Sequence, residues 1–367
     1  MGIQKIILNI VLKIEMFFIS FFKIKQNRIT FISLENDKLT SDMKLIYDQI
    51  KHQYDIKLCL IHYQKSLISQ MKYFFNCLKQ LYLVNTSKIV ILHDNNYVVS
   101  HFKRKEIHVI QLWHACGAIK KFGNVIKREY PIANYNTVLA TSPFWKEAYS
   151  QAFSVKKSDV LPIGLPRTDE LFNKQWCINK RKYLLSKYPQ LQNKKIILYA
   201  PTFRGNIYKG FYQINFDAKK VLEKLTDEYV IIYKFHPLVG NYLLDDHPCI
   251  INMNHEDTHE LFTISDILIS DYSSIVFDYM ILDKPIIFFT PDYFEYKKDL
   301  GVFVDIQNLN LPMCNNEEEI IEEIPHINKY LTEINKLKNQ FFEYQDGLST
   351  ERIVDYINKY MEKNPNA

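Results

Sequence analysis

Polar and charged side chains gather at the points where apolar runs of the sequence end. They are His114, Lys120, Thr202, Arg204, His236, Ser273 and Ser274. The apolar runs read as strands, and open α/β sheets bind their ligands at the carboxyl ends of their strands. This placement predicts that these side chains bind a substrate and carry out chemistry on it.

The second half of the chain carries a pattern typical of a phosphate site. Ser273 and Ser274 come where a helix begins, so they offer hydroxyls and unpaired backbone N–H groups to a phosphate without any glycine. The same serines would serve equally well as an ordinary helix cap. Arg204 and His236 end neighbouring strands of this half and could add positive charge for a diphosphate. Thr202, beside Arg204, is assigned to the same substrate site.

Two further residues have both a functional and a structural interpretation. His114 lies in the first half of the chain, between an aromatic residue and the pair Lys120 and Lys121. A histidine at a strand end is placed to act as a general base near neutral pH, although a lone histidine is often a packed core residue. Asp278, one helical turn beyond the serine pair, could accept hydrogen bonds from ribose hydroxyls or lie on a helix surface.

One short motif suggests zinc. His255, Glu256 and His259 spell HExxH, which on a helix places two imidazoles on one face for a metal ion. The motif falls between two predicted strands, where only a short helix fits, and no third ligand clearly follows it. We interpret the match as accidental. The sequence also lacks a DxD triplet, so we predict no metal site and no cofactor.

The overall composition excludes several classes of protein. Of 367 residues, 47% are apolar and 24% are charged, which is usual for a folded globular chain. Only 9 residues are glycine and no GxG pair occurs, which excludes a P-loop and a GxGxxG dinucleotide-binding motif. The net charge of +5 is spread along the chain, so nucleic-acid binding is not indicated. Six cysteines without CxxC spacing indicate reduced thiols in the cytosol.

Apolar runs alternate with helical stretches in two series. The runs lie at 28–34, 56–62, 88–94, 107–113 and 137–142, and then at 195–201, 229–237, 249–253, 266–271 and 284–289. Continuous apolar strands between helices indicate parallel sheets covered on both faces. We expect an α/β protein with two Rossmann-like domains facing a cleft, one over 28–172 and one over 173–367, the second closed by helices that could brace the two halves.

Residues 1–27 are expected to form an amphipathic helix that associates with a membrane. Within 3–24, Lys5, Asn9 and Lys13 recur at helical spacing opposite a face of Ile, Leu and Phe. The charges are too frequent for a spanning helix, and no small-residue cleavage site follows. Cations opposite a Phe-rich face suit the anionic inner surface of a membrane. The alternative is a helix that packs on the protein's own core.

Five segments resemble the CDP-glycerol glycerophosphotransferases of teichoic acid and capsule synthesis. They are QLWHACGAIKKFG (111–123), GLPRTDEL (164–171), YAPTFRG (199–205), YKFHP (233–237) and SDILISDYSSIVFDYMILDKPIIFF (265–289). They occur in the family's order and spacing. The resemblance implies a GT-B fold, no metal, a donor bound mainly by the second half, and peripheral association with the cytoplasmic face of the cell membrane.

The resemblance also implies a role for each matching residue. His114 would be the base and His236 the second essential histidine, in contact with the donor phosphates. Arg204, Ser273, Ser274 and Asp278 would complete the donor site. A hydroxyl of a membrane-linked saccharide or polymer would then attack the β-phosphorus of CDP-glycerol and release CMP. His236, Arg204 and the helix start at the two serines would stabilise the charge on the phosphates.

Three alternatives remain open at this stage. The same chemistry could use CDP-ribitol or another CDP-alcohol, because the diphosphate and cytidine contacts would be alike. An enzyme of the same architecture could act on a UDP-sugar, either as a glycosyltransferase or as an epimerase. A membrane-surface binding protein without catalysis is the third alternative, and the retention of both histidines and the serine pair argues against it.

Overall fold

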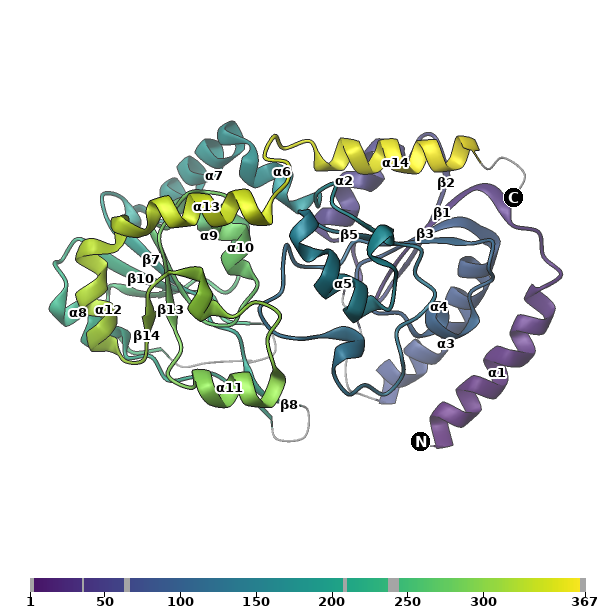
Figure 1. The fold of residues 1–367 in the computed structure, drawn as a ribbon, viewed down its shortest axis with the longest axis horizontal. Coiled ribbons are helices and arrows are strands. Elements are labelled where there is room, and N and C mark those ends of the chain that lie inside the picture. Colours follow the sequence, from purple (N-terminus) through teal and green to yellow (C-terminus); the bar gives the residue numbers. More distant parts are fainter. Residues whose placement is uncertain (1–2, 35, 63–66, 207–209, 237–243, 364–367) are drawn as a thin grey trace. The chain divides into compact units, whose positions relative to one another are not determined.

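The computed structural model describes residues 3–34, 36–62, 67–206, 210–236 and 244–363 (Figure 1). These residues divide into two compact units. Unit 1 comprises the described residues up to His114, then Phe122–Asp169, and the described residues from Leu348 onward. Unit 2 comprises Ala115–Lys121 and the described part of Glu170–Gly347.

Unit 1 is built on a six-stranded sheet with the order β2-β1-β3-β4-β5-β6, in which every neighbouring pair is parallel. The strands are β1 (Lys25–Ser33), β2 (Asp55–Leu60), β3 (Ser87–Leu92), β4 (His108–Gln111), β5 (Thr137–Leu139) and β6 (Val160–Leu161). The helices are α1 (Ile3–Ile19), α2 (Ser41–Ile50), α3 (Leu67–Thr86), α4 (Tyr97–Phe102), α5 (Lys146–Phe153) and α14 (Ser349–Lys363), and α6 (Arg167–Phe172) crosses into unit 2. Every residue of β3 is buried, as expected for a central strand covered on both faces.

Unit 2 repeats this plan with the order β11-β10-β7-β12-β13-β14, again with parallel neighbours. Its strands are β7 (Lys195–Tyr199), β10 (Tyr229–Tyr233), β11 (Ile250–Asn252), β12 (Ile267–Ser270), β13 (Ile286–Phe289) and β14 (Met313–Cys314), with an antiparallel pair β8 (Arg204–Asn206) and β9 (Gly210–Tyr212). Its helices are α7 (Lys174–Lys187), α8 (Ala218–Lys224), α9 (Thr258–Ile264), α10 (Ile275–Met280), α11 (Tyr293–Leu300), α12 (Glu317–Glu323) and α13 (Leu331–Phe341).

The prediction of an α/β fold with two parallel sheets is confirmed. Each of the ten predicted apolar runs overlaps a strand, although most of the strands are shorter than the runs and β1, β2 and β3 begin before them. The two-residue strands β6 and β14 and the pair β8–β9 were not predicted, because they are too short to show a period in the sequence. The predicted ranges also include residues 1–2, 237 and 364–367, which lie outside the described residues.

The compact units differ from the expected domains in three places. The change of unit falls at Asp169 and Glu170 rather than after residue 172, and Ala115–Lys121 groups with unit 2. The chain from Leu348 onward groups with unit 1 rather than with the second half. Long-range contacts decide such boundaries, and they leave no local mark in the sequence.

Hydrogen bonds hold α14 onto unit 1. The Asp169 carboxylate accepts from the backbone N–H groups of Ser349 and Thr350, both at 2.8 Å, and so satisfies donors at the start of α14. Further along the helix, the Tyr356 hydroxyl lies 3.0 Å from Nε2 of His108 and 2.7 Å from Oγ1 of Thr137. In Figure 1, α14 runs beside α2, with which it packs.

Helix α1 lies at the edge of unit 1 and packs on α3 through Leu8, Leu12 and Ile19 (Figure 1). Of the predicted polar stripe, Asn9 accepts a hydrogen bond of 2.5 Å from the Tyr97 hydroxyl, and Lys5 pairs with Glu129 at 3.8 Å. The polar side chains therefore help to seat the helix. Among the described residues, no helix combines the length and apolar character needed to cross a membrane.

The cap of α14 gives a test of the fold. Replacing Asp169 with Ala should lower the free energy of unfolding by about 1–2 kcal/mol, because two buried N–H donors lose their acceptor. Urea unfolding of the full chain measures this. Asp355, an exposed aspartate on the same helix, is the matched control, and Asp355→Ala should change stability by less than about 0.5 kcal/mol. Equal effects of the two substitutions would contradict the capping role.

Candidate active site

His114 stands at a sharp turn that follows β4. The residue before it, Trp113, has a φ of 61°, which is unusual for a bulky side chain and marks a strained backbone. The Trp113 N–H donates to Oε1 of Gln111 at 2.8 Å, and the Trp113 ring stacks on the His114 ring with centroids 3.9 Å apart. The turn and the stacked indole together fix where the imidazole lies.

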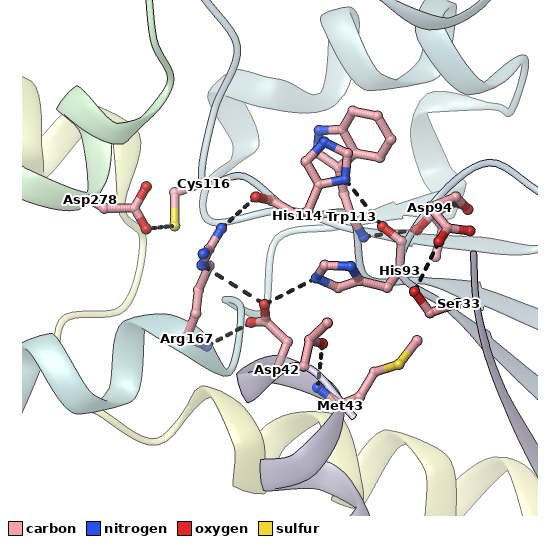
Figure 2. Close-up of polar contacts among 12 residues, drawn as sticks. Ser33, Asp42, Met43, His93, Asp94, Trp113, His114, Cys116, Arg167 and Asp278 are labelled. Carbon is pink, nitrogen blue, oxygen red and sulfur yellow. Dashed lines mark hydrogen bonds and ion pairs between the residues drawn. The ribbon is translucent and has the colours of Figure 1, made fainter. Parts of the chain in front are cut away.

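The hydrogen bond of the His114 ring determines its tautomer. Nδ1 of His114 lies 3.3 Å from the backbone carbonyl oxygen of His93 (Figure 2). A carbonyl oxygen only accepts, so Nδ1 carries the proton and Nε2 keeps its lone pair. Burial, with the nearby His93 and Arg167, lowers the pKa of His114 to about 3. The ring is therefore neutral at neutral pH, which is the state a general base requires.

A buried carboxylate anchors the surroundings of His114. Asp42, in the first turn of α2, is 1% exposed and lies 3.5 Å from Nε2 of His93. It accepts the Arg167 backbone N–H at 2.8 Å, and the Arg167 side chain in turn donates to the backbone carbonyl of His114 (Figure 2). Burial favours the protonated acid, but Arg167 and His93 outweigh it and lower the pKa of Asp42. The charged carboxylate is thus connected to His114 in two ways, through His93 and through Arg167.

The sequence reasoning did not assign these supporting residues. His93 ends the predicted run 88–94, so the rule that selected His114 also applies to it. Arg167 lies inside the segment GLPRTDEL. Asp42 carries no sequence signal, because a single acidic residue near a helix start is usual.

In unit 2, Arg204 is held in a cage of four side chains. Its guanidinium forms two hydrogen bonds to Asp292, at 2.7 and 3.1 Å, and one of 2.8 Å to Asp271. It also lies 4.8 Å from the ring centroids of both Tyr272 and Tyr296. Burial opposes the charge, but the two aspartates outweigh burial and raise the pKa of Arg204. The expected phosphate ligand is thus 6% exposed and already paired.

Two other predicted residues meet at Phe203. Nζ of Lys120 lies 5.0 Å from the centre of the Phe203 ring, and the His236 ring lies 4.7 Å from it. Burial lowers the pKa of both side chains. The pKa of His236 falls to about 4, because the nearby Lys120 lowers it further. Lys120 reaches this place because its segment pairs with the chain after α11, where the Lys121 N–H donates to Gly301 at 3.1 Å.

The remaining predicted side chains of unit 2 are buried or half-buried. Thr202 is 4% exposed, and its backbone N–H donates to Asp271 at 2.8 Å. Ser273 and Ser274 are half-buried before α10, and the Ser274 side chain forms no cap hydrogen bond. Asp278 does not lie on a helix surface, because it is 2% exposed. It bonds to Nε2 of His259 at 3.2 Å and to the Cys116 thiol at 3.1 Å.

The HExxH segment does not form the helical zinc arrangement. Helix α9 begins at Thr258, so His255 precedes the helix and cannot share a helical face with His259. His255 bonds to the Tyr188 hydroxyl at 2.7 Å, whereas His259 is buried against Asp278. Among the described residues, no group of three or more His, Cys, Asp or Glu side chains is arranged to hold a metal ion.

The sequence profile of CDP-glycerol:poly(glycerophosphate) glycerophosphotransferases matches residues 14–359. The chain belongs to this family. It is 30% identical over 372 residues to the teichoic acid glycerol-phosphate primase of Bacillus subtilis (strain 168), covering 93% of this chain and 94% of the primase. It is 31% identical to the teichoic acid poly(ribitol-phosphate) polymerase of Bacillus spizizenii over 93% of this chain, but it spans only 58% of that polymerase.

A solved structure shares the fold of this chain. The wall teichoic acid polymerase TagF superimposes with a TM-score of 0.75, covering 98% of this chain and 96% of that chain at 22% identity. This likeness supports a GT-B-like arrangement of elements. The predicted family and the α/β, GT-B-like fold are therefore confirmed, while the facing cleft, the membrane-associated helix and the roles of individual residues stay predictions.

The cage around Arg204 predicts a large structural role in this family member. Replacing Arg204 with Ala should lower the free energy of unfolding by about 3–5 kcal/mol, because it leaves the buried carboxylate of Asp271 without a counter-charge and also frees the half-buried Asp292. Thermal or urea unfolding measures this, and Arg204→Lys should recover part of the loss. Unchanged stability in Arg204→Ala, with a loss confined to donor binding, would contradict the structural role.

Proposed function

We propose that the protein transfers glycerol phosphate from CDP-glycerol to a hydroxyl of a membrane-linked acceptor and releases CMP, in the synthesis of teichoic acid or a capsular polymer. The state of His114 carries this proposal. Its ring is neutral and its Nε2 lone pair is available to take a proton, within a chain that belongs to a phosphotransferase family.

In the proposed reaction, Nε2 of His114 removes the proton of the acceptor hydroxyl as its oxygen attacks the β-phosphorus of CDP-glycerol. The bond from this phosphorus to the oxygen that bridges the two phosphates breaks, and CMP leaves with that oxygen. No electron acceptor is needed, and the proton remains on His114 until solvent removes it. A neutral imidazole can take up this proton, whereas a protonated one cannot.

We assign the donor phosphates to groups of unit 2. Lys120 and His236 both lie against Phe203, and each can donate a hydrogen bond to a phosphate oxygen. Ser273 and Ser274 add hydroxyls, and these count for more than a helix dipole because α10 has only six residues. Such fixed donors stabilise the charge that develops on transferred phosphates.

Three of the predicted donor residues take positioning roles in this proposal. Arg204 holds Asp271, whose carboxylate in turn accepts the backbone N–H of Thr202. Asp278 bonds to the thiol of Cys116, in the segment that carries Lys120. These buried groups would set the shape of the donor site without touching the phosphates.

We also propose that α1 and the residues after it bind the cytoplasmic surface of the cell membrane. Large apolar side chains on this segment are between 43% and 73% exposed: Ile6, Ile7, Ile10, Ile14, Phe17, Phe18, Phe21 and Phe22. Such a surface is costly in water, and contact with lipid removes the cost. An enzyme held there would meet a lipid-linked acceptor that is confined to the same surface.

A CDP-ribitol donor is the second candidate, because both glycerol-phosphate and ribitol-phosphate enzymes are among the relatives. The test is CMP release by the purified full chain from CDP-glycerol or CDP-ribitol, with membranes that carry lipid-linked saccharide. A UDP-sugar is the third arm, read as UDP release. We expect turnover of CDP-glycerol. Turnover of CDP-ribitol alone would show that the donor is CDP-ribitol rather than CDP-glycerol. Turnover of the UDP-sugar alone would refute the phosphotransferase assignment.

The base assignment gives a separate prediction. Replacing His114 with Ala should lower kcat by about 10²–10⁴-fold, because the acceptor hydroxyl loses its proton acceptor. CDP-glycerol affinity, measured by calorimetry, should stay nearly unchanged because the donor groups belong to unit 2. His52→Ala, at an exposed histidine of unit 1, should leave both quantities as they are. Equal losses of kcat and donor affinity in His114→Ala would show that His114 is not the base.

A further inference from the structure

A cavity of about 670 Å³ lies in unit 1 beside α1 and α3. Its size falls within the range of about 300–1,000 Å³ that is usual for ligand sites. Its apolar lining includes Ile7 and Leu8 from α1 and Met71 and Phe74 from α3. None of these side chains belongs to the candidate active site.

One group of polar side chains in the lining surrounds Lys5, and the lining also includes the polar Gln70 of α3. Nζ of Lys5 is 3.8 Å from the Glu129 carboxylate and 6.0 Å from the ring centroids of both Tyr97 and Tyr130. A second cation, Arg128, lies 5.9 Å from the Tyr130 ring, and its buried Nε has no hydrogen-bond partner among the described residues. The lining thus has an apolar part and one cation, Lys5, that is paired with a carboxylate. Arg128 is not part of the lining but lies beside the lining residue Tyr130.

The cavity is continuous with the exposed apolar surface of α1 and α3. Ile7 and Met71 line it and are also 51% and 64% exposed, and Phe75 extends the same surface at 61%. The membrane contact proposed above would bring this surface among lipid chains. The present inference rests on that contact, because lipid must be at hand to enter.

We propose that the cavity binds one acyl chain of a bilayer phospholipid, with the lipid phosphate beside Lys5 and Arg128. An amphiphile matches a lining whose apolar and cationic parts are separate. Bilayer phospholipids are the most abundant amphiphiles at such a surface, so mass action favours them over rarer lipids. A lipid held between α1 and α3 would fasten the amphipathic helix to the rest of unit 1.

The experiment uses vesicles of phosphatidylglycerol in which a fraction of the acyl chains carries a photoreactive diazirine. The full chain is bound, illuminated and digested, and the labelled residues are located by mass spectrometry. We expect labelling at Tyr73 and Phe74, which line the cavity and are half-buried. Labelling confined to exposed side chains such as Phe17 and Phe21 would show contact with the bilayer but no bound chain, and would overturn the proposal.

Two matched variants separate the cavity from the surface. Ile7 and Ile14 are both exposed and lie seven residues apart on one face of α1, but only Ile7 lines the cavity. Ile7→Trp should fill part of the cavity and reduce labelling at Tyr73 and Phe74 several-fold, while Ile14→Trp should not. Equal labelling in the two variants would overturn the proposal.

Two further arms identify the source of the chain and separate this proposal from the membrane contact. Competing lyso-phosphatidylglycerol should suppress labelling more than farnesyl phosphate does at equal concentration. The reverse order would show that the cavity prefers an isoprenoid chain and would overturn the assignment to an acyl chain. Flotation with vesicles reports the membrane contact by itself. If flotation fails but a dispersed short-chain photoreactive phosphatidylglycerol still labels Phe74, the proposed membrane contact is refuted and acyl-chain binding in the cavity is supported. If flotation succeeds without that labelling, only the cavity proposal falls.

Discussion

The geometry around His114 depends on how one buried carboxylate is neutralised. Asp42 is almost fully enclosed, and a buried charge of this kind persists only with cationic or hydrogen-bonding partners. Its partners, His93 and Arg167, both also bond to His114 through backbone or side-chain groups. The requirement to satisfy Asp42 therefore fixes the imidazole that we propose as the base. Removing that carboxylate would free both of its partners at once.

Unit 2 also contains a buried charge that needs partners, but there the charge is positive. Arg204 is buried, so it needs the aspartates and tyrosine rings that surround it, and these groups shape the ends of β7, β12 and β13. Lys120, which is less buried than Arg204, is placed by backbone pairing of the segment Ala115–Lys121 with the chain after α11. In the donor site that we propose, phosphate would be bound without a glycine-rich loop, by side-chain donors placed at strand ends.

Helix α1 shows how tertiary contacts can leave apolar side chains exposed on the outer side of a helix. A helix on a protein surface normally turns its apolar face inward and a polar face to water. Helix α1 buries Leu8, Leu12 and Ile19, but Lys5 and Asn9 also find partners on unit 1, and the outer side carries exposed Ile and Phe side chains. Exposure of this extent is a mark of an interaction surface. The adjoining cavity extends that surface into the unit and gives it a place for a ligand chain.

The sequence by itself determined the fold class, the ten main strands and the strand-end residues from His114 to Ser274, because apolar runs and the polar residues that follow them are local patterns. The tertiary structure decided what those residues do. Arg204 reads as a phosphate ligand in the sequence, yet it is enclosed by Asp271 and Asp292. Asp42 had no signal, and α14 groups with unit 1 although the sequence assigned residues 173–367 to one domain and allowed only that its closing helices could brace the two halves. Such pairings join residues far apart in the chain, and only packing brings them into contact.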